Sequence, residues 1–394
     1  MTSAMESFDV VIVGAGAAGL MCAIAAGNRG RRVLLLERNE QPGAKILISG
    51  GGRCNFTNLE IVPERFLSAN PHFCKSALSR YTQHDFIALV ERHRIRYHEK
   101  TLGQLFCDGS AREILAMLSA ECAAAHVDVR SGHSVTDVSR SDRFRIETDK
   151  GSFTSPTLVL ATGGLSIPKM GATSFAYDMA RRFNLAVIEP RPGLVPLKVD
   201  GETLELCRTL TGVSVDAIAS CGRTSFRENI LFTHRGLSGP AILQISSYWR
   251  EGDTLSIDLA PSLDPRSFLS DRKRTRPKAE LKTILSELLP TRLAHALTSA
   301  VSEVTIANVP DRDLLALADR LKRWQLKPVG TEGWGKAEVT VCGIDTAALS
   351  SKTMEARDVP GLFAIGEAVD VTGWLGGYNF QWAWSSGWCA GQAV

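Results

Sequence analysis

Residues 8–19 read FDVVIVGAGAAG, and the next apolar run, Val33–Leu36, ends at Glu37. An uninterrupted apolar run before a glycine cluster predicts a buried strand. The GxGxxG spacing, followed by an alanine-rich segment, predicts a tight turn and then a helix. This order of strand, turn, helix and acid-terminated strand is typical of a Rossmann-like nucleotide-binding unit.

The glycines and the acid of this motif each have a physical role. Gly14 permits the tight turn, Gly16 lets backbone N–H groups approach a pyrophosphate, and Gly19 lets the helix pack on the strand. The helix N-terminus then faces the phosphate charge. Glu37 follows Gly14 by 23 positions, where a carboxylate can accept a hydrogen bond from a ribose 2′-hydroxyl. We therefore expect a nucleotide to bind here.

The composition is that of an ordinary globular enzyme with more than one domain. The chain has 394 residues, 44% of them apolar and 22% charged, and this length exceeds what one core usually organises. The net charge of +3 is too small to indicate a nucleic-acid partner by itself. The nine cysteines form no CxxC pair, which argues against a metal site or a disulfide framework and favours a cytoplasmic location. The uncharged stretch 10–27 contains the glycine turn, so we expect no membrane segment.

The pattern of expected elements changes along the chain. Residues up to about 188 alternate strands and helices, residues 190–260 contain short strands such as 194–199, and residues 270–325 have helical periodicity. Strands return from Ala337. We expect an α/β fold with a split Rossmann-like domain (residues 1–188 and 337–394), a β-rich insert (residues 189–268 and 326–336) and a small helical insert (residues 269–325).

Three later segments favour a flavin over a nicotinamide as the resident cofactor. LVLATGG at 158–164 and LFAIGE at 362–367 are buried strands that run into glycine turns. GWLGGYN at 373–379 precedes an expected helix over 380–393. N–H groups at that helix start can bind the pyrimidine edge of a flavin and stabilise charge on its reduced form. Only one GxGxxG is present, so we expect no second domain for NAD(P)H.

The most specific string is PGAKILISGGGRCNFTN at residues 42–58. Together with FTHRGLSGP at 232–240 and GWLGGYNFQWAW at 373–384, it resembles the YhiN-type bacterial flavoprotein family, which includes aminoacetone oxidases and BaiN-like bile-acid enoyl reductases. The resemblance covers essentially the whole chain. It implies a split FAD-binding domain, a β-barrel-like domain and a small helical domain. For the YhiN branch it implies reduction of a uridine to dihydrouridine in 23S ribosomal RNA.

The resemblance also implies which residues contact FAD. The residues that match the family's contacts are Gly14, Gly16, Gly19, Glu37, Arg38, Lys45, Gly51, Gly52, Arg53, Cys54, Asn55, Thr57, Thr162, Gly163, Gly366, Glu367, Gly376, Gly377 and Asn379. The complete expected set adds Ala18, Val135, Gly164, Asp370 and Tyr378. Tyr378 and Trp374 are also candidates to stack on the flavin or on a substrate base.

Reduction of a conjugated C=C bond by a flavin needs a hydride and a proton. Cys54, in the glycine loop expected near the flavin, is a candidate proton donor, and a small buried filler is the alternative role. Cys107 is the second candidate, at a position where many relatives carry proline. His234 and Arg235, in a glycine-flanked loop, are candidates to bind a phosphate or a carbonyl oxygen, or to hold the loop in place.

Basic residues cluster around the helical insert. The cations expected to follow an RNA backbone are Arg272, Lys273, Arg274, Arg276, Lys278, Lys322 and Arg323. The alternative is an ordinary solvated face.

The leading expectation is an FAD-dependent oxidoreductase that uses NAD(P)H to reduce an activated C=C bond, with 23S ribosomal RNA as its partner. One alternative is a small-molecule flavoenzyme, either an enoyl reductase or an amine oxidase. The other is a flavin-containing RNA-binding or assembly factor with little turnover. The oligomeric state is left open.

Overall fold

The structure, a computed structural model, describes residues 5–299 and 304–394. The chain forms two compact units: Met1–Arg191 with Val339–Val394, and Pro192–Glu338.

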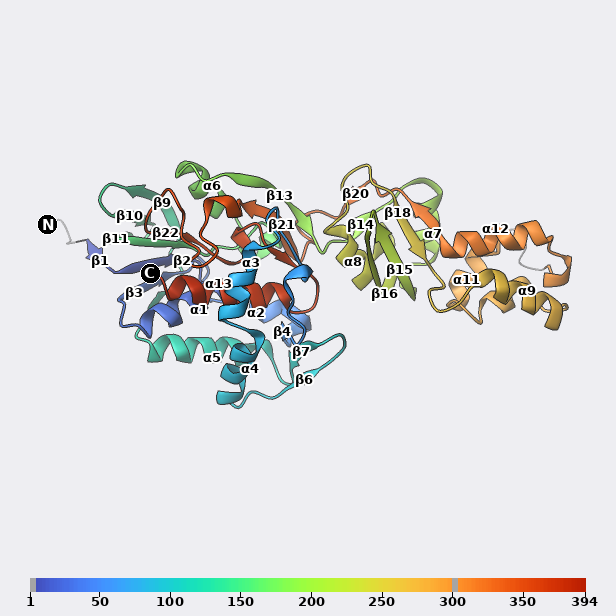
Figure 1. Cartoon of the computed structure of the whole chain (residues 1–394), viewed down its shortest axis with the longest axis horizontal. Helices are drawn as coiled ribbons and strands as arrows, with labels where there is room; N and C mark the ends of the chain where they lie inside the picture. The colour runs from blue at the N-terminus through green and yellow to red at the C-terminus, as the bar shows by residue number, and fades with distance from the viewer. Residues whose placement is uncertain (1–4, 300–303) are drawn as a thin grey trace. The chain divides into compact units, whose positions relative to one another are not determined.

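The first unit is organised by a five-stranded sheet in the order β22-β12-β2-β3-β8 (Figure 1). All four neighbouring pairs are parallel, and Val10–Val13 of β2 is aligned with Val33–Leu36 of β3. The strands β22, β2 and β3 are fully buried, and β12 is buried apart from Thr157, as their apolar runs predict. The strands are β2 (Val10–Val13), β3 (Val33–Leu36), β8 (Asp128–Arg130), β12 (Thr157–Leu160) and β22 (Leu362–Ala364).

Helices from both ends of the chain pack beside this sheet. The first helix, α1, lies beside the last, α13, in Figure 1. They can approach closely because Gly387 has no side chain; a Cβ there would collide with the Ala18 carbonyl oxygen. The helices of this unit are α1 (Ala17–Gly27), α2 (Ala44–Ile48), α3 (Phe73–Arg80), α4 (Gln83–Arg92), α5 (Ala111–Ala124), α6 (Phe175–Arg182) and α13 (Tyr378–Gly391).

Smaller sheets complete the first unit. One has the order β1-β11-β10-β9 and another the order β4-β7-β6. Two strand pairs, β23-β5 and β13-β21, are also present. Their bounds are β1 (Glu6–Ser7), β4 (Asn55–Asn58), β5 (Phe66–Leu67), β6 (Tyr97–Glu99), β7 (Gln104–Cys107), β9 (Val135–Arg140), β10 (Phe144–Thr148), β11 (Gly151–Ser155), β13 (Val187–Gly193), β21 (Val339–Ile344) and β23 (Thr372–Gly373).

The second unit contains a seven-stranded antiparallel sheet in the order β19-β18-β15-β16-β17-β14-β20. The strand expected over 194–199 is shorter, because Pro196 has no N–H to donate to a ladder. The strands are β14 (Leu197–Lys198), β15 (Ser214–Cys221), β16 (Thr224–Thr233), β17 (Gly236–Ser238), β18 (Leu255–Asp258), β19 (Trp324–Leu326) and β20 (Gly330–Thr331).

Helices make up most of the rest of the second unit. The helices α7 (Gly201–Thr209) and α8 (Pro240–Ser246) pack on strands of its sheet. The segment with the helical periodicity contains α9 (Pro265–Thr275), α10 (Leu281–Leu285), α11 (Thr291–Leu297) and α12 (Asp311–Lys322), and α12 packs against α9.

Candidate functional site

The glycine turns expected to contact a cofactor meet at one edge of the parallel sheet. The Gly14 N–H donates to Leu36 O at 2.8 Å, and the Ala161 N–H donates to Val13 O at 2.9 Å. The Ile365 N–H continues the ladder to Leu160 O at 3.1 Å. The carboxyl ends of β2, β3, β12 and β22 are therefore side by side, which is where nucleotides bind in open α/β sheets.

The turn after β2 has the geometry that the motif requires. Gly14 has a φ of +106°, and a Cβ there would lie 2.6 Å from Ala161 O. A Cβ at Gly19 would collide with the Gly14 carbonyl oxygen, so the helix can approach the strand only with glycine there. A Cβ at Gly16 would instead meet no atom within 4 Å. Gly16 is thus not required by the packing of the described residues, and the space beside it is open to a phosphate.

Glu37 is directed at this turn. Its side chain is 8% exposed, and its Oε2 accepts a hydrogen bond from the Ala15 N–H at 2.9 Å. Its Oε1 accepts from the Asn39 N–H at 2.9 Å. The carboxylate is fixed beside the glycine turn, as the Rossmann motif predicts.

A network of polar side chains joins the other turns. Lys45 Nζ lies 2.7 Å from Glu367 Oε2 and donates to Ser166 Oγ at 2.7 Å. Ser166 Oγ donates to Glu367 Oε1 at 2.7 Å, and the Thr340 N–H donates to the same oxygen at 2.8 Å. Burial raises the pKa of Glu367, but the Lys45 charge and these hydrogen bonds outweigh it, so the pKa lies below its ordinary value. Glu367 is therefore ionised at neutral pH.

Two observations test whether this edge fits a nucleotide cofactor. The Thr162 hydroxyl is buried in the turn after β12 and has no hydrogen-bond partner among the described residues. Such a group is costly without a ligand or water to pair with. A Cβ at Gly51 would meet no atom within 4 Å, as at Gly16. The arrangement fits a cofactor that contacts backbone at these glycines.

The segment from Gly43 to Asn58 lies against the same edge. The Gly43 N–H donates to Ala15 O at 2.9 Å. Its 3-10 turn, Ser49–Gly52, leads into Cys54, which has a left-handed φ of +51°. Arg53 is exposed, and its carbonyl accepts from the Cys107 N–H at 3.0 Å.

The start of α13 packs on this segment. Gly377 has a φ of +94°, and a Cβ there would collide with the Thr57 backbone. Gln381 Oε1 accepts a hydrogen bond from Thr57 Oγ1 at 2.7 Å. Further along the helix, Trp382 Nε1 donates to Gly366 O at 2.9 Å. The helix α13 thus connects Gly376 and Gly377 with the turn after β22.

Two expected contacts have side chains that are engaged elsewhere. Tyr378 is 3% exposed, and its hydroxyl is hydrogen-bonded to Arg65. Its side chain therefore cannot stack on a substrate base, and only its backbone is available to a cofactor. Asp370 is 3% exposed, and its Oδ2 accepts from the Ala69 N–H at 2.8 Å.

The remaining expected contacts lie near these turns. Ala18 is packed against Gly366, where a Cβ would lie 2.8 Å from its methyl group. Gly164 is packed beside Thr340. Arg38 is exposed and donates to Gly171 O at 3.4 Å. The Asn379 amide holds the Gly373 backbone at 2.8 and 2.9 Å. Val135 begins β9, just after the His133 N–H donates to Glu37 O at 2.8 Å.

Both candidate thiols are buried. Cys54 and Cys107 are each 0% exposed, and burial raises the pKa of each to about 12. Both are therefore protonated at neutral pH, but neither sulfur reaches solvent. For Cys54, this burial favours the filler role.

The second unit positions the other candidates. His234 and Arg235 are exposed on the turn between β16 and β17. Arg235 Nη1 lies 3.5 Å from Glu332 Oε2.

Most of the basic cluster is paired with acids. Arg272 and Arg276 share Glu287, Lys273 pairs with Asp311, and Arg274 pairs with Asp271. Lys322 Nζ lies 2.8 Å from Asp258 Oδ2. Lys278 and Arg323 are exposed and have no ion pair with a described residue.

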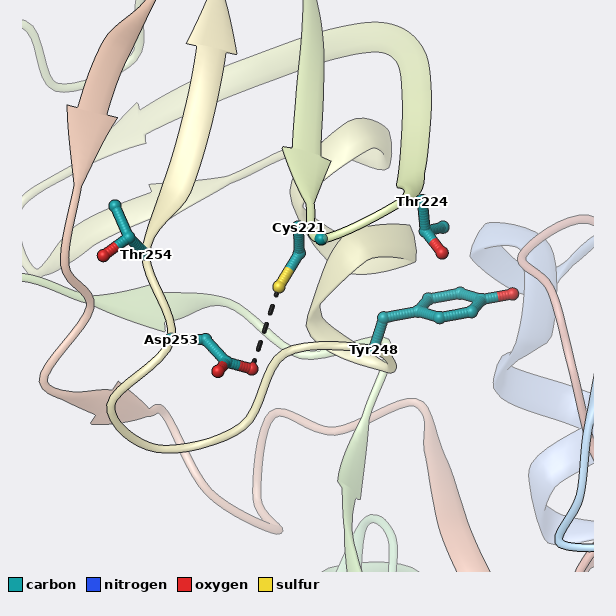
Figure 2. Close-up of a pocket in the computed structure, with 6 residues that line it drawn as sticks. Cys221, Thr224, Tyr248, Asp253 and Thr254 are labelled. Carbon is teal, nitrogen blue, oxygen red and sulfur yellow. Dashed lines mark hydrogen bonds between the residues drawn. The ribbon is translucent and has the colours of Figure 1, made fainter.

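The second unit also contains a shallow pocket that the sequence did not indicate (Figure 2). Its Cys221 Sγ donates to Asp253 Oδ2 at 3.8 Å. Burial and the Asp253 charge raise the pKa of this thiol, so it is not an activated nucleophile. The pocket is lined by Cys221, Gly222, Thr224, Tyr248, Asp253 and Thr254.

Sequence reasoning missed Ser166, Thr340 and Gln381. Ser166 and Thr340 are small polar residues outside the quoted motifs, and Gln381 lies within residues 373–384 but was not singled out there; only the fold brings these side chains to the turns. Arg65 was also missed. Within residues 5–299 and 304–394, no group of three His, Cys, Asp or Glu side chains could hold a metal ion. The helices of the described chain are too short or too polar to cross a bilayer.

Comparison with known proteins agrees with this geometry. The chain is 52% identical over 392 residues to "Ribosomal RNA dihydrouridine synthase" of Escherichia coli (strain K12), covering 98% of each chain. It is 47% identical to the protein of the same name from Haemophilus influenzae, again over 98% of each. It is 29% identical to "3-dehydro-bile acid delta(4,6)-reductase" of Clostridium scindens, over 97% of this chain and 98% of that one.

The family model described as "HI0933-like protein Rossmann domain" matches residues 8–393. This match confirms both the resemblance and the Rossmann-type FAD-binding fold expected from the glycine motif. The chain belongs to the HI0933-like family of flavoproteins.

Proposed function

We propose that this protein is an FAD-dependent reductase that uses NAD(P)H to convert a uridine of 23S ribosomal RNA to dihydrouridine. The assignment of the substrate rests on sequence identity. About half of all positions, over nearly the full length, are identical to those of two ribosomal RNA dihydrouridine synthases. The geometry at the carboxyl ends of the parallel strands supports the assignment of FAD as the cofactor.

The residues at the sheet edge divide the binding of FAD between them. Gly16 and the first turn of α1 would hold the pyrophosphate, and Glu37 would hold the adenosine ribose. Lys45 and Glu367, held by their ion pair, fix the turns that surround the rest of the cofactor. The N–H groups at the start of α13 would bind the flavin pyrimidine edge and stabilise negative charge there.

FAD, when bound, supplies hydride transfer, and the protein must supply or relay a proton. Saturation of the uracil C5=C6 bond takes one hydride at C6 and one proton at C5, and NAD(P)H is the source of the hydride. Cys54 lies in the segment Gly43–Asn58, and Cys107 is joined to that segment by the hydrogen bond from its N–H to Arg53 O, so these two thiols are the candidate proton donors. Their burial requires either a local movement or a water relay before they can act.

The RNA contacts are also a proposal. Lys278 and Arg323 are free to meet phosphates, whereas Arg272, Lys273, Arg274, Arg276 and Lys322 must first exchange a carboxylate partner for a phosphate. His234 and Arg235 present donors on an exposed turn that suit a phosphate or a uracil carbonyl.

A deletion strain tests this function. Dihydrouridine in 23S ribosomal RNA should disappear on deletion of the gene and return when the wild-type gene is supplied on a plasmid. A Gly16→Val gene, which should give a folded protein without FAD, should fail to restore it. Persistence of dihydrouridine in the deletion strain would contradict the proposal. Restoration by the FAD-free variant would favour an assembly factor.

A further inference from the structure

An exposed leucine stands at the tip of a hairpin beside the start of α13. The hairpin consists of β6 and β7, and its turn contains Leu102, which is 64% exposed. This is the largest exposed fraction among the large exposed apolar side chains of the described chain. Leu102 also has a left-handed φ of +54°, which non-glycine residues with a branched apolar side chain rarely adopt.

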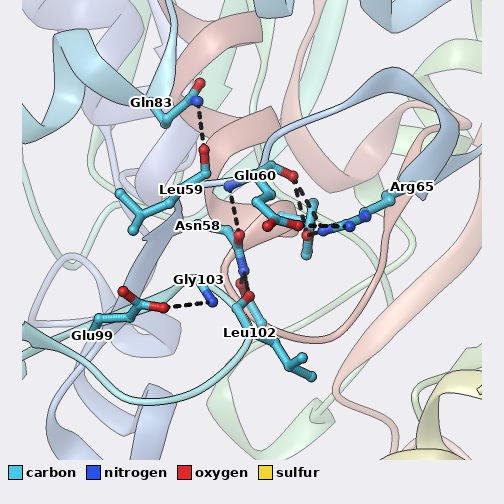
Figure 3. Close-up of polar contacts among 10 residues, drawn as sticks. Asn58, Leu59, Glu60, Arg65, Gln83, Glu99, Leu102 and Gly103 are labelled. Atoms are coloured by element: carbon cyan, nitrogen blue, oxygen red, sulfur yellow. Dashed lines mark hydrogen bonds and ion pairs between the residues drawn. The ribbon is translucent and has the colours of Figure 1, made fainter. Parts of the chain in front are cut away.

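The turn is held in this conformation by several hydrogen bonds (Figure 3). Glu99 Oε1 accepts from the Gly103 N–H at 3.1 Å, and the Leu59 N–H donates to Gly103 O at 2.8 Å. The Asn58 amide nitrogen donates to Leu102 O at 3.0 Å. The tip is therefore rigid, although its leucine side chain points into solvent.

The same Asn58 nitrogen ties the hairpin tip to the cofactor edge. It also donates to Gly376 O at 2.9 Å, in the glycine turn at the start of α13. Gln104, the first residue of β7 after the turn, packs 3.0 Å from where a Gly376 Cβ would lie. Leu102 is thus fixed relative to the turn that we assign to the flavin pyrimidine edge.

The stability of the fold does not explain why leucine occupies position 102. Asn or Gly would relieve the backbone strain, and a polar residue would avoid the exposed apolar surface. Strain that the surroundings maintain is more often found at functional positions.

The chemistry of the proposed reaction supplies a reason. A uridine in folded RNA is stacked between its neighbours, so an enzyme that acts on C5 and C6 must take the base out of the stack. Proteins that unstack bases often insert an apolar side chain into the gap. We infer that Leu102 is a positioning residue that fills the gap left by the target uridine in ribosomal RNA. This inference rests on the proposed function.

Exposed cations lie at the tip, next to Glu99, and at the opposite end of the hairpin, where the Cys107 N–H donates to Arg53 O. Lys100 is exposed and lies over the Phe106 ring, at 5.4 Å from its centroid, without an ion pair to a described residue. Arg53 is exposed and likewise has no ion pair within the part of the chain that the structure describes. These cations can meet the phosphates that flank an unstacked base.

The test compares three variants with the wild type on 23S ribosomal RNA purified from the deletion strain. Leu102→Asn removes the apolar group but suits the left-handed backbone. Leu102→Met keeps an apolar side chain of similar volume. Leu315→Gln is the control, because Leu315 is 49% exposed on α12 in the second unit.

The Leu102→Asn variant should form dihydrouridine in folded RNA at least about tenfold more slowly than the wild type, because no apolar side chain fills the gap left by the unstacked base. Its Tm and FAD content should equal or exceed those of the wild type. Its rate should approach the wild-type rate on short unstructured fragments of the same RNA. Leu102→Met and Leu315→Gln should behave like the wild type on folded RNA.

Three outcomes would overturn the inference. The first is a wild-type rate for Leu102→Asn on folded RNA. The second is a rate for Leu102→Met as slow as that of Leu102→Asn. The third is a fall in Tm with loss of FAD in Leu102→Asn. Failure of the wild-type protein itself to form dihydrouridine would refute the proposed function, and the inference with it. The wild-type reaction therefore separates the two failures.

Discussion

Lys45 and Glu367 form an ion pair of 2.7 Å between residues 322 positions apart. One comes from the glycine-rich segment after β3, and the other follows β22. The pair connects the first and last parts of the split domain at the edge where their strands end. Both side chains are mostly buried, with 32% and 20% of their surfaces exposed.

Glu367→Gln should destabilise the protein at neutral pH by about 1–3 kcal/mol, because a hydrogen-bonded charge partner of Lys45 is lost. The pKa of Glu367 is lowered in the folded state from its ordinary value of 4.5. Its contribution is therefore fully present above about pH 4.5 and is lost as the pH falls through the lowered pKa. Urea unfolding with excess FAD, at several pH values, measures the difference. A difference between wild type and variant that does not shrink in acid would contradict this.

Gly16→Val should fold but bind little FAD. Its backbone is extended (φ −81°, ψ −170°), which valine adopts readily, and a Cβ there meets no atom of the described chain. The matched variant Gly19→Val should fail to fold, because its side chain would collide with Gly14. Circular dichroism and the flavin absorbance of the purified proteins distinguish the two. Full FAD occupancy in folded Gly16→Val would contradict the proposal that this turn binds the pyrophosphate.

The Cys54→Ala variant distinguishes the two roles considered for Cys54, proton donor and buried filler. A proton donor predicts normal flavin reduction by NAD(P)H but about 10²-fold slower substrate reduction. Because Cys54 is fully buried, we expect the filler role, with substrate reduction slowed by less than about threefold and a loss of stability of about 1 kcal/mol. Stopped-flow measurement of the two half-reactions decides between them, and Cys107→Ala is the next variant if the rate falls strongly.

Neutralising Lys278 and Arg323 should reduce the salt dependence of RNA binding more per charge than neutralising Arg272 and Arg276. The first two have no ion pair with a described residue, whereas the latter share Glu287. Each cation that no longer neutralises a phosphate should lower the slope of log affinity against log salt by about 0.7–0.9. Equal slopes for the two double variants and the wild type would identify the whole cluster as a solvated face.

The sequence predicted the nucleotide-binding part of the fold well, because its signals are local. The run Val10–Val13, the spacing of Gly14 and Gly19, and the position of Glu37 each specify geometry within a few tens of residues. The expected helix over 380–393 is also present, two residues earlier, as α13.

The remainder depends on distant contacts that no local pattern encodes. The hydrogen bond that Arg65 donates to the Tyr378 hydroxyl holds a candidate stacking residue in the core. Glu287 and Asp311, which lie outside the basic run, neutralise part of its charge through ion pairs. The left-handed conformation of the exposed Leu102 depends on a hydrogen bond from the distant Asn58 as well as on the Glu99–Gly103 bond within the hairpin.

The most direct test is reconstitution of the reaction with purified components. FAD-loaded protein, NADH or NADPH, and 23S ribosomal RNA from the deletion strain are incubated, and the RNA is digested and analysed by mass spectrometry. We expect a uridine that gains two mass units, about one per RNA molecule, in step with NAD(P)H oxidation. NAD(P)H oxidation without dihydrouridine, while a small-molecule enone is reduced, would contradict this expectation and identify a small-molecule reductase.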